Sequence, residues 1–61
     1  MNIDDMKYVR AVVNNEGFDY AFVHYSDFND IDDKEFHKLR KEFIDARNKL
    51  KKHIGLEEDE I

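Results

Sequence analysis

Cysteine is absent from this chain of 61 residues, which excludes a disulfide framework, thiolate catalysis and cysteine-ligated zinc. The apolar runs are only a few residues long, too short for a transmembrane helix, and the first residues, MNIDDMK, do not resemble a secretory signal peptide. Glycine-rich phosphate loops and linkers rich in proline, glycine or serine are also missing. We therefore expect a soluble cytoplasmic protein.

Apolar side chains are nevertheless numerous enough for a folded domain. Leu, Ile, Val and Phe make up 17 of the 61 residues, a larger share than the roughly 20% that marks disordered chains. A domain of about 60 residues buries only roughly 60% of the surface of its unfolded chain, so its stability is small. We expect residues 1–56 to form a single helical domain and residues 57–61 to form an acidic tail.

The first amphipathic helix is predicted from Ile3 to Glu16. Asn2 precedes it as the N-cap and Gly17 follows it as the residue that ends the helix. Apolar residues recur at spacings of three and four, which indicates one buried stripe: Ile3, Met6, Val9, Val12 and Val13.

The second long helix is predicted to follow Asp32, its N-cap, with Glu35 completing a capping box. Ile31 and Phe36 are placed for a hydrophobic staple, and Gly55 is expected to end the helix. The apolar stripe of this helix is close to the a/d spacing of a heptad seam: Phe36, Leu39, Phe43, Ala46, Leu50 and Ile54.

Residues 17–28 admit two interpretations. Read as a helix, the apolar residues from Phe18 to Phe28 fall on one side of it. Read as a hairpin strand, the stretch has the expected wealth of aromatic and β-branched residues. We favour a helix that frays after Tyr25. The sequence thus predicts the all-α class: a small three-helix unit in which helices 1 and 3 are antiparallel and a short aromatic-rich helix lies between them.

The net charge of −5 conceals an asymmetry along the chain. Residues 1–33 hold eight acidic and two basic side chains, residues 34–54 hold three acidic and eight basic ones, and residues 55–61 hold four acidic ones. At about 100° per residue, five lysines gather opposite the apolar stripe of the second long helix: Lys34, Lys38, Lys41, Lys49 and Lys52. These lysines form either a strip that binds nucleic-acid phosphates or a solvated outer face of the helix. The negative net charge of the chain favours the solvated face. Mimicry of DNA by the acidic residues 27–35 is a further alternative.

Residues that carry chemistry are few and poorly placed for catalysis or metal binding. The segment after Asp27 lacks the ligand positions of an EF-hand loop, and His24, His37 and His53 lack the spacing of a zinc site. Ser26, the single serine, lies in a turn-like context and not in a nucleophile elbow. We therefore expect no catalytic residue, no metal and no cofactor, and a protein that is not an enzyme.

The excess of aromatic side chains is more informative. Seven Phe and Tyr residues lie between positions 18 and 43, more than so small a unit encloses, and exposed aromatic patches mark partner or self-association sites. The alternative is that these rings fill a core that has few leucines. The side chains that we predict to contact a partner are Tyr8, Tyr20, Val23 and Phe28.

The stretch from Glu16 to Ile54, EGFDYAFVHYSDFNDIDDKEFHKLRKEFIDARNKLKKHI, resembles small uncharacterised proteins encoded by tailed bacteriophages. The resemblance rests on GFDYAF, YSDF and EFHKLR and covers about two thirds of the chain. It implies no activity and no catalytic residue. It does imply a context, the cytoplasm of a host cell, in which many small phage proteins bind a host or phage macromolecule.

These observations together predict a non-catalytic protein-interaction module. Its expected partner is a host or phage protein, or a second copy of the chain in a homodimer, bound through the aromatic patch. Nucleic-acid binding through the lysines of the second long helix and acidic DNA mimicry are the alternatives, and no membrane partner is expected.

Overall fold

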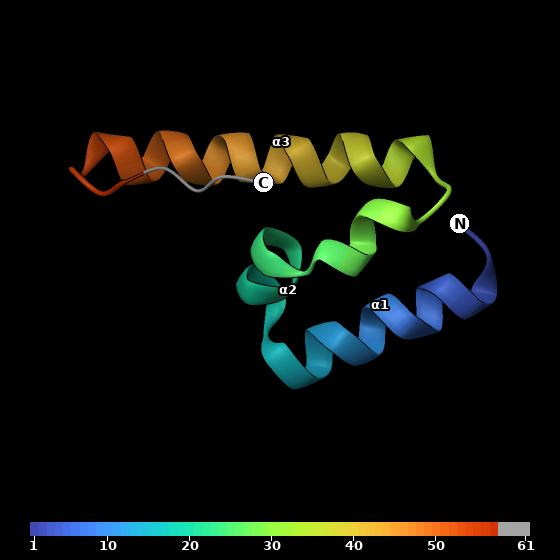
Figure 1. Cartoon of the computed structure of the whole chain (residues 1–61). Coiled ribbons are helices and arrows are strands. Elements are labelled where there is room, and N and C mark those ends of the chain that lie inside the picture. Colours follow the sequence, from blue (N-terminus) through green and yellow to red (C-terminus); the bar gives the residue numbers. More distant parts are fainter. Residues whose placement is uncertain (58–61) are drawn as a thin grey trace.

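The computed structural model describes residues 1–57, and these residues form an all-helical fold (Figure 1). Helix α1 spans Ile3–Glu16, α2 spans Phe18–His24, the 3-10 helix η1 spans Ser26–Asp30, and α3 spans Lys34–His53. No strand occurs within the described range, so the predicted all-α class is confirmed and the hairpin alternative is wrong. Residues 58–61 of the predicted acidic tail lie outside the described residues.

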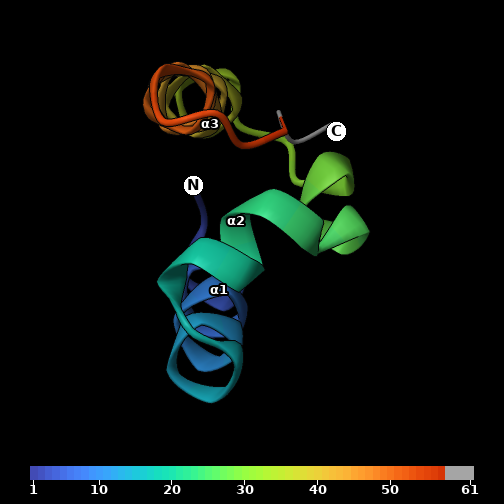
Figure 2. The same ribbon diagram turned by 90° about the vertical axis from the view of Figure 1, so that its left-hand side faces the viewer.

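The two long helices run in the same direction, contrary to the antiparallel arrangement that we predicted. In Figure 1 both α1 and α3 run from right to left, and in Figure 2 the C-terminal ends of both point toward the viewer. The reason lies in the segment between them, because α2 and η1 carry the chain back across the molecule. Two reversals restore the original direction, and α2 contacts both α1 and α3.

The ends of α1 follow local sequence signals. The side chain of Asn2 accepts a hydrogen bond from the backbone N–H of Asp5 at 2.8 Å, which satisfies one of the free donors of the first turn. Gly17 has a φ of 90°, a conformation that favours glycine, and its N–H donates to the carbonyl of Val13 at 2.9 Å. The predicted extent of α1 is confirmed.

The N-cap of α3 is Asp33, whereas we predicted Asp32. The Asp33 carboxylate accepts a hydrogen bond from the N–H of Phe36 at 2.9 Å and also lies 2.7 Å from the amino group of Met1. This ion pair joins residues 32 positions apart in the chain. It favours Asp33 over Asp32 as the N-cap, and the local sequence does not reveal it. The predicted capping box between Asp32 and Glu35 is therefore wrong.

The other end of α3 is closed by a Schellman motif, in which Gly55 has a φ of 84°. The N–H of Leu56 donates to the carbonyl of Lys51 at 2.8 Å, and the N–H of Gly55 donates to that of Lys52 at 3.1 Å. These bonds satisfy carbonyls that the helix end leaves free. The prediction that Gly55 ends this helix is confirmed.

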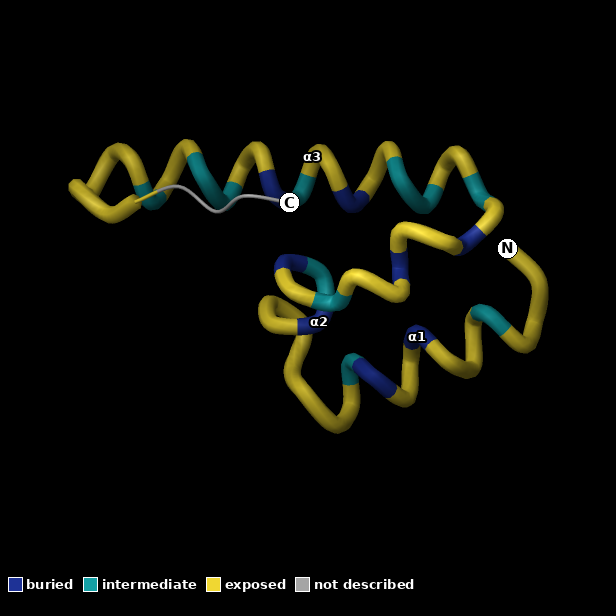
Figure 3. The backbone as a smooth tube through the Cα atoms, viewed as in Figure 1, coloured by how far each residue is buried: buried dark blue, intermediate teal, exposed yellow. Residues whose placement is uncertain are grey.

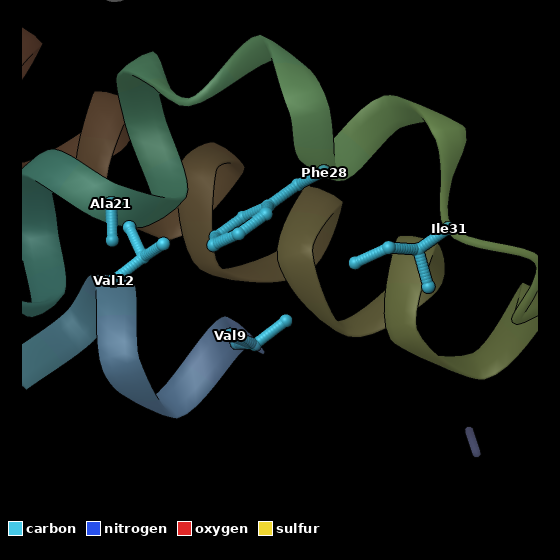
Figure 4. Close-up of a cluster of buried hydrophobic side chains, with 5 residues drawn as sticks. All are labelled: Val9, Val12, Ala21, Phe28 and Ile31. Atoms are coloured by element: carbon cyan, nitrogen blue, oxygen red, sulfur yellow. The ribbon is translucent and has the colours of Figure 1, made fainter. Parts of the chain in front are cut away.

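The core lies where α1, α2 and η1 meet (Figure 4). In Figure 4, Val12 of α1 points toward Ala21 of α2, and the ring of Phe28 lies between α1 and α3. The buried cluster consists of Val9, Val12, Ala21, Phe28 and Ile31, with Val13, Phe22, Tyr25 and Phe36 packed against it.

Much of the predicted apolar stripe of each long helix remains exposed (Figure 3). On α1, Val9 and Val12 are buried but Ile3 is exposed. On α3, the buried residues are Arg40 and Ile44, which lie beside the predicted stripe and not on it. The reason is that α2 and η1 are short and cover only the first part of α3, which then projects past them (Figure 1).

Replacing Asp33 with Asn tests the ion pair between this carboxylate and the amino terminus. The amine of Met1 holds the pKa of Asp33 below its ordinary value of 3.8, and the carboxylate holds the pKa of the amine above 8.0. The first shift stabilises the fold above pH 3.8 and its effect is lost as the pH falls through the lowered pKa. The second stabilises it below pH 8.0 and its effect is lost as the pH rises through the raised pKa.

Asparagine keeps the capping oxygen of position 33 but removes its charge. We therefore expect the thermal midpoint of Asp33→Asn to lie furthest below that of the wild type between the two pKa values and to converge with it as the pH falls through the lowered pKa of Asp33. The measurement is thermal unfolding followed by helical circular dichroism over a pH series. Identical midpoints at every pH would contradict a stabilising ion pair.

Candidate protein-interaction surface

An apolar groove lies between α2 and α3. It has a volume of about 130 Å³ and is lined by Phe18, Phe22, Phe36, Leu39, Arg40 and Phe43. The rim is open to solvent, since 57% of Phe18 and 53% of Leu39 are exposed. Five of its six lining residues are apolar, so the groove suits an apolar side chain of a partner better than a polar ligand.

Ring contacts fix the aromatic walls of this groove. Phe18 packs against Phe22 with ring centroids 4.7 Å apart and meets Phe43 edge-on at 5.4 Å. Phe22 in turn contacts the buried ring of Phe28 at 5.7 Å and that of Phe36 at 6.1 Å. Such pairs are favourable beyond their buried area. Because the exposed rim rests on the core, the groove is formed before any partner arrives.

The apolar surface continues beyond the groove along α3. Leu50 and Ile54 are each 69% exposed and follow Leu39 at helical spacing on the same side. Single exposed apolar residues are ordinary, whereas contiguous ones mark interaction sites. We call this surface, from the groove to the end of α3, the apolar face; it comprises Phe18, Leu39, Phe43, Ala46, Leu50 and Ile54.

The four side chains that we predicted to contact a partner divide into two pairs. Tyr8 and Tyr20 are exposed, but Val23 is only 3% exposed and Phe28 is fully buried. The expectation that Val23 and Phe28 reach the surface is therefore wrong. Helix α2 is contacted on one side by α1 and on another by α3, and η1 turns Phe28 into the core (Figure 4). Neither side chain can form part of a surface patch.

Tyr8 and Tyr20 both lie beside Asp27. The Tyr8 hydroxyl donates a hydrogen bond to the Asp27 carboxylate at 2.9 Å, and this bond, with partial burial, raises the pKa of Tyr8 above its ordinary value. The ring of Tyr20 lies 5.1 Å from that of His24, and both residues line a shallow hollow with Asp27. This hollow shares no lining residue with the groove, so the two tyrosines form a separate surface.

The five lysines of the predicted nucleic-acid strip are all exposed: Lys34, Lys38, Lys41, Lys49 and Lys52. Their spacing places them on the side of α3 opposite the apolar face. Lys38 lies 4.0 Å from Glu42 and Lys41 lies 3.0 Å from Asp45, each one helical turn away. These pairs reduce the positive potential of the strip, which is therefore weaker than a count of lysines suggests.

Arg40 joins α3 to α2 and η1, a role that we did not predict from the sequence. Its side chain is buried, with only 6% exposed. The guanidinium donates hydrogen bonds to the carbonyls of Phe22 at 2.8 Å and Tyr25 at 3.3 Å, and to the side-chain oxygen of Asn29 at 2.7 Å. It also lies over the ring of Phe28, 5.8 Å from the centroid. Burial lowers the pKa of Arg40 from its ordinary value.

A sequence signal for this role exists. Phe36, Phe43 and Ile44 stand four residues before Arg40 and three and four residues after it, which places the arginine at the middle of an apolar helix face. A charge in that position is either an error in the expected packing or a buried hydrogen-bonding group. In this structure Arg40 is a buried hydrogen-bonding group.

Within residues 1–57, no group of three or more histidine, cysteine or acidic side chains is placed to hold a metal ion. None of the helices in the described part of the chain is long and apolar enough to cross a membrane. Comparison of the chain with protein-family models, curated proteins and solved structures finds no match. The function must therefore be inferred from the surface itself.

We expect Arg40→Lys to lower the free energy of unfolding by about 1.5 to 3 kcal/mol. A lysine ammonium cannot reproduce the planar fork that reaches two backbone carbonyls and Asn29 at once. The measurement is denaturant unfolding followed by circular dichroism. Arg10→Lys, the same change at an exposed position of α1, is the matched control and should alter stability by less than about 0.5 kcal/mol. Equal stability of the two variants would show that the hydrogen bonds of Arg40 do not stabilise the packing of α3 against α2 and η1.

Proposed function

We propose that this protein is a non-catalytic interaction module that binds another polypeptide through the apolar face. The observation that carries the proposal is the continuity of that face, which runs from the groove rim at Phe18 and Leu39 to Leu50 near the end of α3. Burial of such surface is favourable by roughly 25 cal/mol per Å². The resemblance to phage proteins points to a host or phage protein as the partner.

The pre-formed groove adds specificity to this surface. Association is weakened by every side chain that must be ordered at the interface. The rings of Phe18 and Phe43 already contact each other, and Phe22 links them to the core. A partner that places one apolar side chain in the groove beside these rings therefore orders little of this protein.

Tyr8 and Tyr20 are proposed as a second contact point. Tyrosine is enriched at interfaces because its ring is apolar and its hydroxyl forms hydrogen bonds. The hydroxyl of Tyr8 is already held by Asp27, and that carboxylate adds a negative charge that favours a basic partner surface.

Nucleic-acid binding through the lysine side of α3 is the second candidate function. The exposure of all five lysines on one side favours it, whereas the net charge of −5 and the pairing of Lys38 and Lys41 oppose it. DNA mimicry has less support, since Asp27 is engaged by Tyr8 and Asp33 by the amine of Met1.

Affinity purification with matched variants distinguishes these functions. Immobilised protein is incubated with bacterial lysate, with and without nuclease, and washed at low and high salt. We expect a stoichiometric protein that survives nuclease and high salt, is lost with Leu39→Asp, and is kept with Lys52→Asp. Both variants place an aspartate at an exposed position of α3, on opposite sides, and circular dichroism confirms that each is folded.

Two other results would change the conclusion. Material that disappears with nuclease or high salt, and that Lys52→Asp also loses, would favour nucleic-acid binding, because phosphate contacts weaken steeply with salt. Capture of the same protein by Leu39→Asp at unchanged yield would contradict binding through the apolar face.

A further inference from the structure

We infer that the apolar face binds a second copy of this chain, in an antiparallel pair of α3 helices related by a two-fold axis. The inference rests on the proposed function because it uses the same face, and it names the partner. Four features of α3 support it: the spacing of its apolar residues, the shapes of its two halves, the charges beside the seam, and the small size of the core.

The apolar residues of α3 have the spacing of a coiled-coil seam. In the single chain, the face of α3 that turns inward is centred on Arg40 and Ile44. A second row beside it occupies successive a and d positions of heptads: Phe36, Leu39, Phe43, Ala46 and Leu50. Phe36 and Phe43 of this row also pack against rings of the same chain, whereas Leu39, Ala46 and Leu50 are exposed and remain available to another helix.

The two halves of this seam are complementary in shape. The N-terminal half carries the groove, with Leu39 and Phe43 at its rim, and the C-terminal half carries the protruding Leu50. In an antiparallel pair centred between positions 43 and 46, Leu50 of each copy meets Leu39 and the groove of the other. Phe43 then faces Ala46, a large residue against a small one. The two-fold axis repeats each contact, which closes the assembly as a dimer.

Charges beside the seam are compatible with the antiparallel orientation. Glu42 and Lys49 occupy successive g positions and are exposed. In the antiparallel pair, Glu42 of each copy faces Lys49 of the other, so two opposite-charge pairs form. In a parallel pair, Lys49 would face the apolar Ile54 of the other copy and Glu42 would face Arg47, so the shapes of the two halves, and not these charges, select the antiparallel orientation.

Dimer formation also adds burial that the single chain lacks. Within residues 1–57, seven apolar side chains are buried, and Leu39, Leu50 and Ile54 are among the large ones that remain exposed. The C-terminal half of α3 extends past α1 and α2 in Figure 1, and Leu50 on this half is exposed. Association of copies would stabilise the fold by mass action.

Sedimentation equilibrium from micromolar to millimolar protein tests the association. We expect a monomer–dimer equilibrium for the wild type and a dissociation constant raised at least about tenfold by Leu50→Asp, which removes the side chain that enters the groove. Lys52→Asp places an aspartate on the opposite side of α3 and should change the constant less than about threefold. Circular dichroism checks that both variants are folded.

Charge exchange tests the orientation. Glu42→Lys and Lys49→Glu each place like charges opposite one another twice, so each variant alone should dimerise more weakly than the wild type. The double variant restores both opposite-charge pairs and should regain the wild-type constant. An equimolar mixture of the two single variants should form the heterodimer in preference to either homodimer, because every facing pair in it has opposite sign.

Cysteine cross-linking gives an independent measure, since the natural chain has no cysteine. Leu39→Cys mixed with Leu50→Cys should give a mixed disulfide under mild oxidation, whereas Leu50→Cys alone should give none. A disulfide between two copies of Leu50→Cys, without the mixed product, would overturn the antiparallel arrangement.

A wild-type protein that stays monomeric at millimolar concentration would overturn the inference entirely. Lysate capture through Leu39 by such a monomer would reject self-association and still sustain the proposed function. A dimer that Leu50→Asp leaves intact, with no protein captured from lysate through Leu39, would reject both. The two failures are therefore distinguishable.

Discussion

One buried guanidinium determines how the long helix sits on the rest of the molecule. Arg40 donates to the carbonyl of Phe22 in the last turn of α2 and to that of Tyr25 just after it. Carbonyls at a helix C-terminus lack intrahelical partners and carry partial negative charge, so a cation is favoured there. Asn29 completes the set from η1. The same side chain thus joins α2, η1 and α3, and it lines the groove between α2 and α3.

The inward position of Arg40 also decides which residues of α3 face outward. Successive residues of an α-helix differ by about 100°, so turning Arg40 and Ile44 toward α2 moves Leu39 and Ala46 to the side. A buried charge is a weak source of net stability. Its effect here is on orientation: an apolar row that would otherwise form the core becomes an exposed rim that a partner can reach.

Local features of this fold could be predicted from the sequence, and non-local ones could not. The N-cap at Asn2 and the helix ends at Gly17 and Gly55 depend on neighbouring residues, and each was predicted correctly. The direction of α3, the choice of Asp33 as its cap, and the burial of Val23 depend on elements distant in the chain. Periodicity shows that a helix side is apolar, but not whether α2 or solvent covers it. For this reason Leu39, Leu50 and Ile54 were expected in the core and were missing from the predicted site.

The exposed apolar residues of α3 have properties that an incomplete core does not explain. Unburied remainders of a small core would be scattered and loosely held, whereas this row is contiguous, heptad-spaced and backed at one end by aromatic rings in mutual contact. The lysines on the opposite side of α3 keep that side hydrated, so only one side of the helix is suited to association. Under the proposed function, one helix serves both folding and binding: Arg40 lies on its buried side, and Leu39 and Leu50 lie on its exposed side.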